Sequence, residues 1–300
     1  MAPCSTEGNN TSLSTRNAAE PEVYMVVLVT GCRSGFGKLI AVFAARRGHK
    51  VYAGLRDLTT SAELVQMAHG LDVTPIQLDV TDPGQRAAAV RRIIVEQGRI
   101  DGLVNNAGVV LGGFLEQVEE DELRKVFEVN VFGPWALTKL VLPSMREQRA
   151  GRVINISSMA GILALPGVGA YAGSKFALEG LSESWRHELS LMGIDLYTVQ
   201  PGTYDTDIWT RNRTLCRNAL KEGSPWFPHA SHLLETVQQT VSKQIRAPDE
   251  VAELVCELLD GRRRRMRHAI GPGTLQRGVV KRYLPFAVLE RAVRRAFRKA

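Results

Sequence analysis

The stretch Val23-Tyr-Met-Val-Val-Leu-Val-Thr30, followed by Gly31-Cys-Arg-Ser-Gly-Phe-Gly37, decides the fold of this chain. Its first part is a continuous apolar run of strand length, typical of a strand buried on both faces. Lys38 to Arg47 then carry apolar residues at helical spacing. A buried strand, a glycine turn and a helix start form a setting in which backbone N–H groups hold a pyrophosphate. A glycine turn can also merely join a strand to a helix.

Strand and helix patterns continue to alternate along the chain. Further strands are predicted at 50–54, 73–78, 102–104, 152–156 and 194–199, with a short last strand near 268–271. Helices are predicted near 59–69, 83–97, 119–146, 168–192 and 248–259, the third bent near Gly133-Pro134. This alternation predicts an α/β fold, a doubly wound (Rossmann) three-layer fold with a mostly parallel seven-stranded sheet.

Composition divides the chain into three parts. Residues 1–21 are polar and rich in Ser, Thr and Asn, so we expect a disordered N-terminal arm. Residues 22–275 read as one domain with a substrate loop at about 205–235. Residues 276–300 form a basic, amphipathic C-terminal tail.

Charge and cysteine content limit the class of protein. The net charge is +7, but residues 261–300 hold thirteen Lys or Arg against the single acid Glu290, so the basic character belongs to the tail. The four cysteines form no C-x-x-C pair and have no histidine at metal-ligand spacing, so we expect reduced, structural thiols and no metal. The chain shows no secretory signal and no apolar run long enough to span a bilayer, which favours a cytoplasmic protein.

The second strand ends in residues that bear on cofactor choice. An acid at the tip of this strand would bind the ribose hydroxyls of NAD, whereas an arginine can hold the 2′-phosphate of NADP. Our preferred alignment places Leu55 at the tip, Arg56 beside it and Arg33 of the glycine turn facing the same ribose. This arrangement favours NADP over NAD. Asp57 is the opposing signal, unless it serves as an N-cap for the next helix.

Tyr171-Ala-Gly-Ser-Lys175 is the candidate reactive stretch. Residues four apart share a helix face, so the phenol and the ammonium can point into the same space. A nearby positive charge favours the phenolate, so we expect Lys175 to lower the pKa of Tyr171 and to make proton exchange with a substrate feasible near neutral pH. A single Y-x-x-x-K also occurs by chance as a solvated helix face.

Taken in order, the motifs resemble the short-chain dehydrogenase/reductase superfamily over about residues 23–271. They are Thr30-Gly-x-x-x-Gly-x-Gly37, Asn105-Asn-Ala-Gly108, Asn130, Ser158, Tyr171-x-x-x-Lys175 and Pro201-Gly202-x-x-x-Thr206. Two stretches, Thr-Gly-Cys-x-Ser-Gly-Phe-Gly and Tyr-x-x-Ser-Lys-Phe-Ala-Leu-Glu-Gly, are similar to the retinol dehydrogenase and 17β-hydroxysteroid dehydrogenase branch. The resemblance implies hydride transfer between a nicotinamide and an alcohol or carbonyl carbon.

The resemblance also implies a role for each matching residue. Tyr171 would be the general acid/base, Lys175 the cation that tunes it and binds the nicotinamide ribose, and Ser158 the donor that polarises the carbonyl. Asn130 would hold a water that links the lysine to solvent. The implied cofactor contacts are Gly31, Arg33, Ser34, Gly35, Phe36, Gly37, Arg56, Asp79, Val80, Asn106, Ala107, Gly108, Tyr171, Lys175, Pro201, Gly202 and Thr206, and Asn105 would line the adenosine site.

Two positions depart from the related enzymes. Arg33 stands where retinoid enzymes often have an acid, which again favours NADP. Tyr204 replaces a small or aliphatic residue, so it either alters the roof of the pocket or packs locally.

Partners are less strongly specified by the sequence. Trp209, Trp226 and Phe227 in the substrate loop suggest an apolar alcohol or carbonyl substrate, such as a retinoid, steroid, fatty or aromatic compound, but they can equally pack the loop onto its own domain. The resemblance implies a homo-dimer or homo-tetramer through the helices near 119–146 and 168–192.

The tail has two interpretations, peripheral contact with a membrane or a cap on the substrate entrance. We expect no nucleic-acid partner, because no recognised binding fold accompanies the basic run. Two rival functions are a non-catalytic dinucleotide sensor or scaffold and an epimerase or dehydratase. Asn130, Ser158, Tyr171 and Lys175 are all present, which disfavours a non-catalytic protein, and the C-terminal part is short for the second class.

Overall fold

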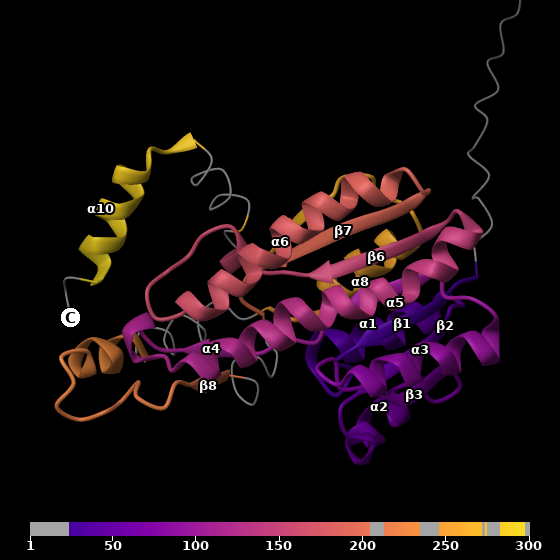
Figure 1. Cartoon of the computed structure of the whole chain (residues 1–300), viewed down its shortest axis with the longest axis horizontal. Coiled ribbons are helices and arrows are strands. Elements are labelled where there is room, and N and C mark those ends of the chain that lie inside the picture. The colour runs from indigo at the N-terminus through magenta and orange to yellow at the C-terminus, as the bar shows by residue number, and fades with distance from the viewer. Residues whose placement is uncertain (1–23, 205–212, 235–245, 272–273, 275–282, 298–300) are drawn as a thin grey trace, which may run out of the picture.

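The centre of the fold is a parallel sheet of seven strands in the order β3-β2-β1-β4-β6-β7-β9 (Figure 1). The structure is a computed structural model, described here for residues 24–204, 213–234, 246–271, 274 and 283–297. The strands are β1 (Val26–Thr30), β2 (Lys50–Leu55), β3 (Val73–Gln77), β4 (Gly102–Asn105), β6 (Gly151–Ile156), β7 (Ile194–Pro201) and β9 (Arg267–Ile270). The strand order reverses between β1 and β4, where sheets of this kind bind ligands.

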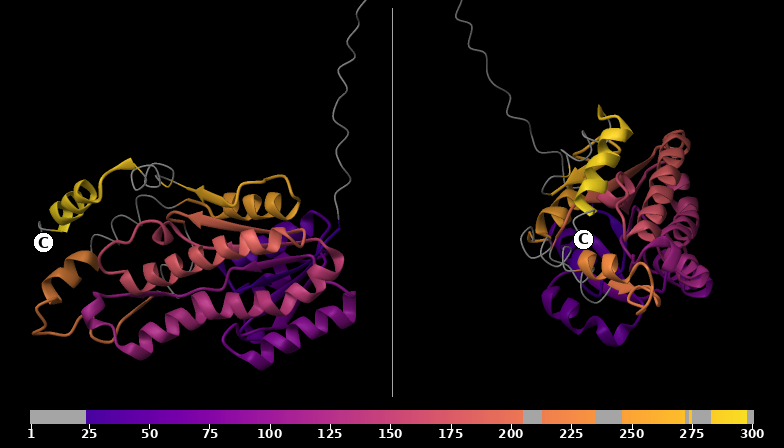
Figure 2. Two further views of the ribbon diagram at one scale, coloured as in Figure 1. Left: turned by 45° about the horizontal axis from the view of Figure 1, so that its top comes forward. Right: turned by 90° about the vertical axis from the view of Figure 1, so that its left-hand side faces the viewer.

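Helices cover both faces of the sheet, so the predicted three-layer doubly wound fold is confirmed (Figures 1 and 2). One core cluster joins the sheet to α1 (Gly35–Arg46), α2 (Ala62–Met67) and α8 (Asp249–Leu259). The other joins it to α3 (Pro83–Gln97), α5 (Gly133–Gln148) and α6 (Gly169–Ser190). The central strand β1 is wholly buried because both faces of the sheet are covered, which explains its continuous apolar run.

A second, small sheet was not predicted from the sequence. It pairs β5 (Val110–Gly112) with β8 (Arg213–Leu215) in parallel. Each strand has three residues, and the two lie about one hundred residues apart in the chain. So short an element shows no measurable alternation of apolar and polar residues, which is why it leaves no recognisable pattern.

The long helix predicted at 119–146 is interrupted. It consists of α4 (Glu120–Phe127), a π-helical turn (Glu128–Phe132) and α5. The irregular turn therefore comes directly before the expected bend at Gly133-Pro134. Asn130 lies in this turn, and its side chain forms hydrogen bonds with the backbone of Val109.

Several expectations fall partly outside the described residues. The arm at 1–21, Trp209, Thr206 and Cys4 lie there, and so does much of the C-terminal tail. Among the described residues, α10 (Phe286–Phe297) carries the end of that tail, no helix is long and apolar enough to cross a membrane, and no group of side chains could hold a metal ion. The three described cysteines are free and buried, as predicted.

Candidate active site

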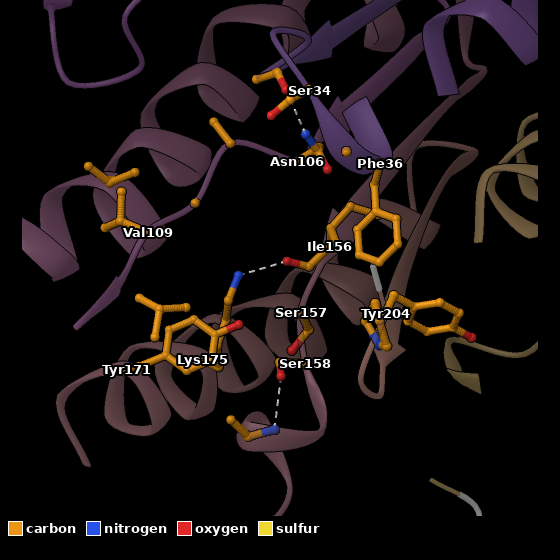
Figure 3. A pocket seen from close by; sticks show the side chains of 18 of the residues that line it. Ser34, Phe36, Asn106, Val109, Ile156, Ser157, Ser158, Tyr171, Lys175 and Tyr204 are labelled. Carbon is orange, nitrogen blue, oxygen red and sulfur yellow. Dashed lines mark hydrogen bonds between the residues drawn. The ribbon is translucent and has the colours of Figure 1, made fainter. Parts of the chain in front are cut away.

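A cavity of about 490 Å³ opens at the carboxyl ends of the strands (Figure 3). It brings together residues that the sequence places more than 170 positions apart. The predicted site residues that line it are Gly31, Arg33, Ser34, Gly35, Phe36, Arg56, Asp79, Val80, Asn106, Ala107, Gly108, Ser158, Tyr171, Lys175, Pro201 and Gly202. Gly37 and Asn130 lie behind this lining, and Thr206 lies outside the described residues.

The glycine loop, residues 31–37, is held against Asn106 by close backbone contacts. Gly31 has φ +71°, a conformation that favours glycine, and a Cβ there would lie 2.9 Å from the Cα of Ala107. A Cβ on Gly37 would overlap both the Asn106 amide and the Gly31 carbonyl. The Asn106 amide donates to the carbonyls of Thr30 (2.8 Å) and Gly31 (3.2 Å). Gly37 therefore serves the loop by packing inside it rather than by lining the cavity.

The N-terminus of α1 can accept an anion. Its N-cap residue, Ser34, makes no side-chain capping bond, and the first turn contains no acidic residue. Backbone N–H groups of this turn thus keep free hydrogen-bonding capacity next to the positive end of the helix dipole. This end of the cavity fits a pyrophosphate.

Arginine side chains line the next part of the cavity. Arg33 and Arg56 stand there with Leu55 and Asp57. The Asp57 carboxylate accepts hydrogen bonds from the Thr59 N–H (2.9 Å) and hydroxyl (2.7 Å), which hold the pKa of Asp57 below its usual value. Asp57 therefore caps the short helical turn that follows β2, as its alternative interpretation predicted.

Asp79 lies at the carboxyl end of β3 and lines the cavity beside Val80. One of its carboxylate oxygens accepts from the N–H (2.9 Å) and the hydroxyl (2.8 Å) of Thr81. This local turn fixes the carboxylate at the edge of the cavity, where it can accept a hydrogen bond from a ligand.

Tyr171, Lys175 and Ser158 meet on the opposite side of the cavity (Figure 3). The Lys175 ammonium lies 5.8 Å from the centre of the Tyr171 ring and donates to the carbonyl oxygen of Ile156 (2.8 Å). Ser158 accepts a hydrogen bond from the Ala160 N–H (3.1 Å), which orients its hydroxyl group. The helix register therefore does bring the phenol and the ammonium into one space.

The expected direction of the Tyr171 pKa is wrong for the protein alone. Burial raises the pKa of Tyr171 to about 12, and the nearby Ser158 hydroxyl only partly opposes this rise. Lys175 does not lower it, because its ammonium is directed to the Ile156 carbonyl and is itself desolvated. Burial lowers the pKa of Lys175 to about 8, and the charge of Glu179 opposes that fall.

The two asparagines expected at the site have structural partners. The Asn130 side chain accepts from the Val109 N–H (2.9 Å) and donates to the Val109 carbonyl (2.9 Å) and the Ser174 hydroxyl (3.0 Å). Asn105 does not line the cavity, which corrects its expected place at an adenosine site. Its amide donates to Thr138 (3.1 Å) and Asn155 (2.8 Å), linking the sheet to α5.

Tyr204 is 1% exposed and packs locally, in line with one of its two interpretations. Its ring meets that of Phe36 edge to face at 5.5 Å, and its hydroxyl donates to Glu250 of α8 (2.7 Å). The same residue lines the cavity, next to Pro201 and Gly202. Tyr204 thus fixes the end of β7 against both the glycine loop and α8.

Sequence reasoning missed the apolar wall of the cavity. This wall consists of Val109, Val110, Val129, Met159, Leu163, Leu165 and Val168. These residues come from a short strand, two helical turns and loops, and they follow no common sequence pattern, so only the folded chain groups them. By contrast, Trp226 stacks on Phe114 at 4.7 Å and donates to Glu116, and neither Trp226 nor Phe227 lines the cavity. Those two aromatic residues belong to what we call the outer segment, residues 213–234, which packs against α4 and the loop before it.

Comparison with known proteins agrees with this geometry. The family model of short chain dehydrogenases matches residues 25–216. The chain is 34% identical to a 3-ketodihydrosphingosine reductase of Bacteroides thetaiotaomicron, covering 82% of this chain and 88% of that one, and 36% identical to the 17-beta-hydroxysteroid dehydrogenase type 1 of Homo sapiens, covering 76% and 72%. A short chain dehydrogenase/reductase of Burkholderia phymatum in complex with NAD has a TM-score of 0.75 at 28% identity, covering 86% and 93%.

The family match extends over more than half of the chain, and the fold and the cavity have the features that such enzymes need. The glycine loop, the uncapped start of α1 and the buried lysine fit a nicotinamide dinucleotide. The chain therefore belongs to the short-chain dehydrogenase family and is an NAD(P)-dependent oxidoreductase that acts on CH–OH groups.

Proposed function

We propose that this protein uses NADP(H) to interconvert an alcohol and a carbonyl on an apolar substrate, of the retinoid, steroid, fatty or aromatic type. The observation that carries the proposal is the convergence of Tyr171, Ser158 and Lys175 in one cavity whose adjoining wall is apolar. The bound cofactor supplies or accepts the hydride. The chain's own residues then hold the substrate oxygen and move its proton.

Each residue of the reactive group has a distinct task in this proposal. Ser158, its hydroxyl oriented by the Ala160 N–H, donates a hydrogen bond to the substrate oxygen. Tyr171 exchanges the proton with the same oxygen. Lys175 binds the ribose next to the nicotinamide with the N–H groups that its bond to Ile156 leaves over. At neutral pH a phenol with a pKa of about 12 is protonated, which is the form that reduction of a carbonyl requires.

Turnover by a Tyr171→Phe variant tests the proposal directly. Wild-type protein should oxidise NADPH in the presence of one member of a panel of retinoid, steroid, aliphatic and aromatic carbonyls. The variant should lose turnover by about 10²- to 10⁴-fold, the usual contribution of a general acid, and still bind NADPH. Full turnover by Tyr171→Phe would contradict this role of the tyrosine. Binding of NADPH without turnover on any carbonyl would favour the dinucleotide sensor.

The preference for NADPH is assigned to Arg33 and Arg56. Both line the cavity, and the nearby Asp57 carboxylate is occupied by Thr59. Arginine matches a 2′-phosphate in charge and geometry. Affinities for NADPH and NADH should be measured for Arg33→Ala, Arg56→Ala and a control, Arg92→Ala, whose side chain pairs with Glu96 on α3. The first two should lose affinity for NADPH alone; an unchanged preference in both would reject this assignment.

Oligomerisation through α5 and α6 is also proposed. Large apolar side chains are exposed along these helices and the π-helical turn before them: Phe132, Trp135, Leu140, Phe176 and Leu181. Such a grouping is typical of a protein–protein interface. Light scattering should give a dimer or tetramer for the wild type and a smaller species for Leu181→Arg. A monomeric wild type would contradict the proposal.

The end of the tail is proposed to contact an anionic membrane surface. In α10, Phe286 and Val288 are exposed, while Arg291, Arg294 and Arg295 supply positive charge against the single acid Glu290, which pairs with Arg294. A basic amphipathic helix of this kind binds anionic lipid by burying its apolar face. Wild-type protein should sediment with phosphatidylserine-containing vesicles and less with neutral ones, and Phe286→Asp should weaken this. Equal recovery with both vesicles, or with neither, would reject it.

A further inference from the structure

Glu179 is a buried carboxylate that the proposed mechanism does not use. It lies on α6, four residues after Lys175 and eight after Tyr171, so all three share one face of the helix. Its side chain is only 6% exposed. A buried charge is costly unless other groups satisfy it, so its presence calls for a specific reason.

Three side chains hold the Glu179 carboxylate. One oxygen accepts a hydrogen bond from the Gln200 amide (2.9 Å), and the other accepts from the Thr198 hydroxyl (3.3 Å) and the Arg267 guanidinium (3.0 Å). Thr198 and Gln200 belong to β7, and Arg267 belongs to β9. The carboxylate is thus held by side chains of two strands of the sheet.

The loop that carries Ser158 rests on the same turn of α6. A Cβ on Gly161 would lie 3.0 Å from the Ser157 hydroxyl, 3.1 Å from the Lys175 carbonyl and 3.2 Å from Cγ of Glu179. The absence of a side chain at Gly161 therefore lets the serine loop, the lysine turn and Glu179 pack together. Glu179 therefore packs close to the Ser157 hydroxyl and to the backbone of Lys175.

Among the described residues, few charged groups act on Lys175. Its side chain is buried and its ammonium is bonded to a neutral carbonyl, and Glu179 is the acid whose field favours its charged form. Among the described residues, the other charged groups near Glu179 are Arg267 on β9 and Glu183 on α6, which binds Arg267 from the surface (2.5 Å). The end of β6 (Asn155 and Ile156), the serine loop and the nearby part of β7 carry neutral side chains.

We propose that Glu179 is a positioning residue that keeps the Lys175 side chain as an ammonium at the cavity, while Gln200, Thr198 and Arg267 fix the carboxylate for that purpose. The relevance of this role to catalysis rests on the function proposed above. The alternative is that Glu179 merely ties α6 to β7 and β9. The two roles predict different results when the Glu179 charge is removed: only the positioning role predicts a change in the protonation of Lys175.

The direct test is the pH dependence of Lys175 acetylation by acetic anhydride in cofactor-free protein, followed by mass spectrometry. Glu179→Gln keeps the shape of the side chain and one acceptor oxygen but removes the charge and replaces the other oxygen by an NH2 donor. The pH of half-maximal labelling should fall by about one unit, because one neighbouring opposite charge is lost. Glu183→Gln, which contacts the same Arg267 from the surface, should leave that midpoint in place.

A second variant should shift the labelling midpoint of Lys175 in the opposite direction. Arg267→Gln removes a positive charge that shares Glu179, so the midpoint for Lys175 should rise. This variant keeps the proposal testable where Glu179→Gln fails to fold. An unchanged midpoint in Glu179→Gln together with a lower melting temperature, or a falling midpoint in Arg267→Gln, would leave Glu179 as a structural tie and overturn the proposal.

NADPH affinity across pH separates this inference from the proposed function. The alkaline loss of affinity should begin at lower pH in Glu179→Gln, in parallel with labelling. A shifted labelling midpoint in a protein whose wild type neither binds nor oxidises NADPH would retain the charge role and reject the proposed function. Wild-type turnover together with an unshifted labelling midpoint in Glu179→Gln would support the proposed function and reject the charge role of Glu179.

Discussion

The glycine loop lines the cavity, whereas the outer segment lies beside it through the pairing of β8 with β5, and the two are held in place by different interactions. The loop is fixed by atoms in direct contact: Gly31 lies against the Ala107 backbone and Gly37 against the Asn106 side-chain amide, with no room for a Cβ. The outer segment is held by the three-residue pairing of β8 with β5 and by surface side chains, such as Arg217 with Asp121. A side chain added at Gly31 or Gly37 would therefore disrupt the glycine loop. The stability of the outer segment is instead spread over many weak contacts.

The largest effect is expected from Gly37→Ala. The added methyl group overlaps the Gly31 carbonyl and the Asn106 amide, so the loop must open before the chain can fold around it. We expect NADPH affinity to fall on the order of 100-fold, equivalent to about 2.7 kcal/mol, with a lower melting temperature. Fluorescence titration measures the first and calorimetry the second.

The control for that variant is Gly180→Ala. Gly180 is exposed within α6 and has no atom within 4 Å of its Cβ position. The alanine should raise the free energy of unfolding by about 0.5–1 kcal/mol, because it lowers the entropy of the unfolded chain. Near-normal NADPH binding by Gly37→Ala would remove the contrast between the two regions.

A smaller loss is expected from Asn106→Ala. Its amide ties the loop to β1 through the carbonyls of Thr30 and Gly31, and the variant leaves these two acceptors without their donor. We expect about tenfold weaker NADPH binding and a loss of about 1–3 kcal/mol in unfolding free energy. Asn218→Ala is the matched change in the outer segment, where the amide bonds Glu119 (2.7 Å), and it should leave NADPH affinity unchanged. Equal losses in both variants would show that the regions are energetically coupled.

Trp226→Leu should affect the substrate but not the cofactor. The indole ring stacks on Phe114 and its N–H donates to Glu116, which secures the outer segment next to the apolar wall. An aromatic pair contributes about 0.5–1.5 kcal/mol, so KM for the apolar carbonyl should rise by roughly 2- to 12-fold. NADPH affinity, measured on the same preparation, should stay constant. A change in NADPH affinity with an unchanged KM would contradict the proposed link between Trp226 and substrate binding.

The same contrast explains how much the sequence could predict. Gly31, Gly35 and Gly37 follow a buried strand at fixed spacing because backbone geometry demands glycine there, and such a demand is visible in the residues themselves. The N-cap interpretation of Asp57 is likewise local, and its carboxylate accepts from the N–H and the hydroxyl of Thr59. These are local constraints between neighbours in the chain.

The rest of the site depends on contacts between distant residues. No spacing rule pairs Val110 with Arg213 or groups Leu163 with Val129 in one wall. The direction of the Tyr171 pKa was also predicted wrongly, because helix register places the two side chains but burial decides their charge. Asn105 and Asn106 are adjacent in the chain, yet only Asn106 faces the cavity. Burial and long-range packing are therefore what the sequence did not reveal.

Arg217→Ala should give the smallest effect. Arg217 reaches Asp121 of α4 across the surface (2.9 Å), and both side chains are more than half exposed. Solvent screens such a pair and ordering two long side chains costs entropy, so the melting temperature should fall by less than about 2 °C. Calorimetry of the variant beside the wild type measures the difference. A much larger fall in melting temperature would contradict the view that Arg217 contributes only a solvent-screened surface charge pair.

The pH dependence of that small difference has a definite sign. The hydrogen bond from Arg217 lowers the pKa of Asp121 in the folded chain. The contribution to stability is therefore present above the unfolded-state pKa of the carboxyl group and is lost as pH falls through the lowered folded value. Melting curves of wild type and Arg217→Ala should differ at pH 7 and converge in acid or in 0.5 M salt, roughly the range in which surface charges are screened. A difference that persists in both conditions would show that Arg217 holds the outer segment by packing rather than by charge.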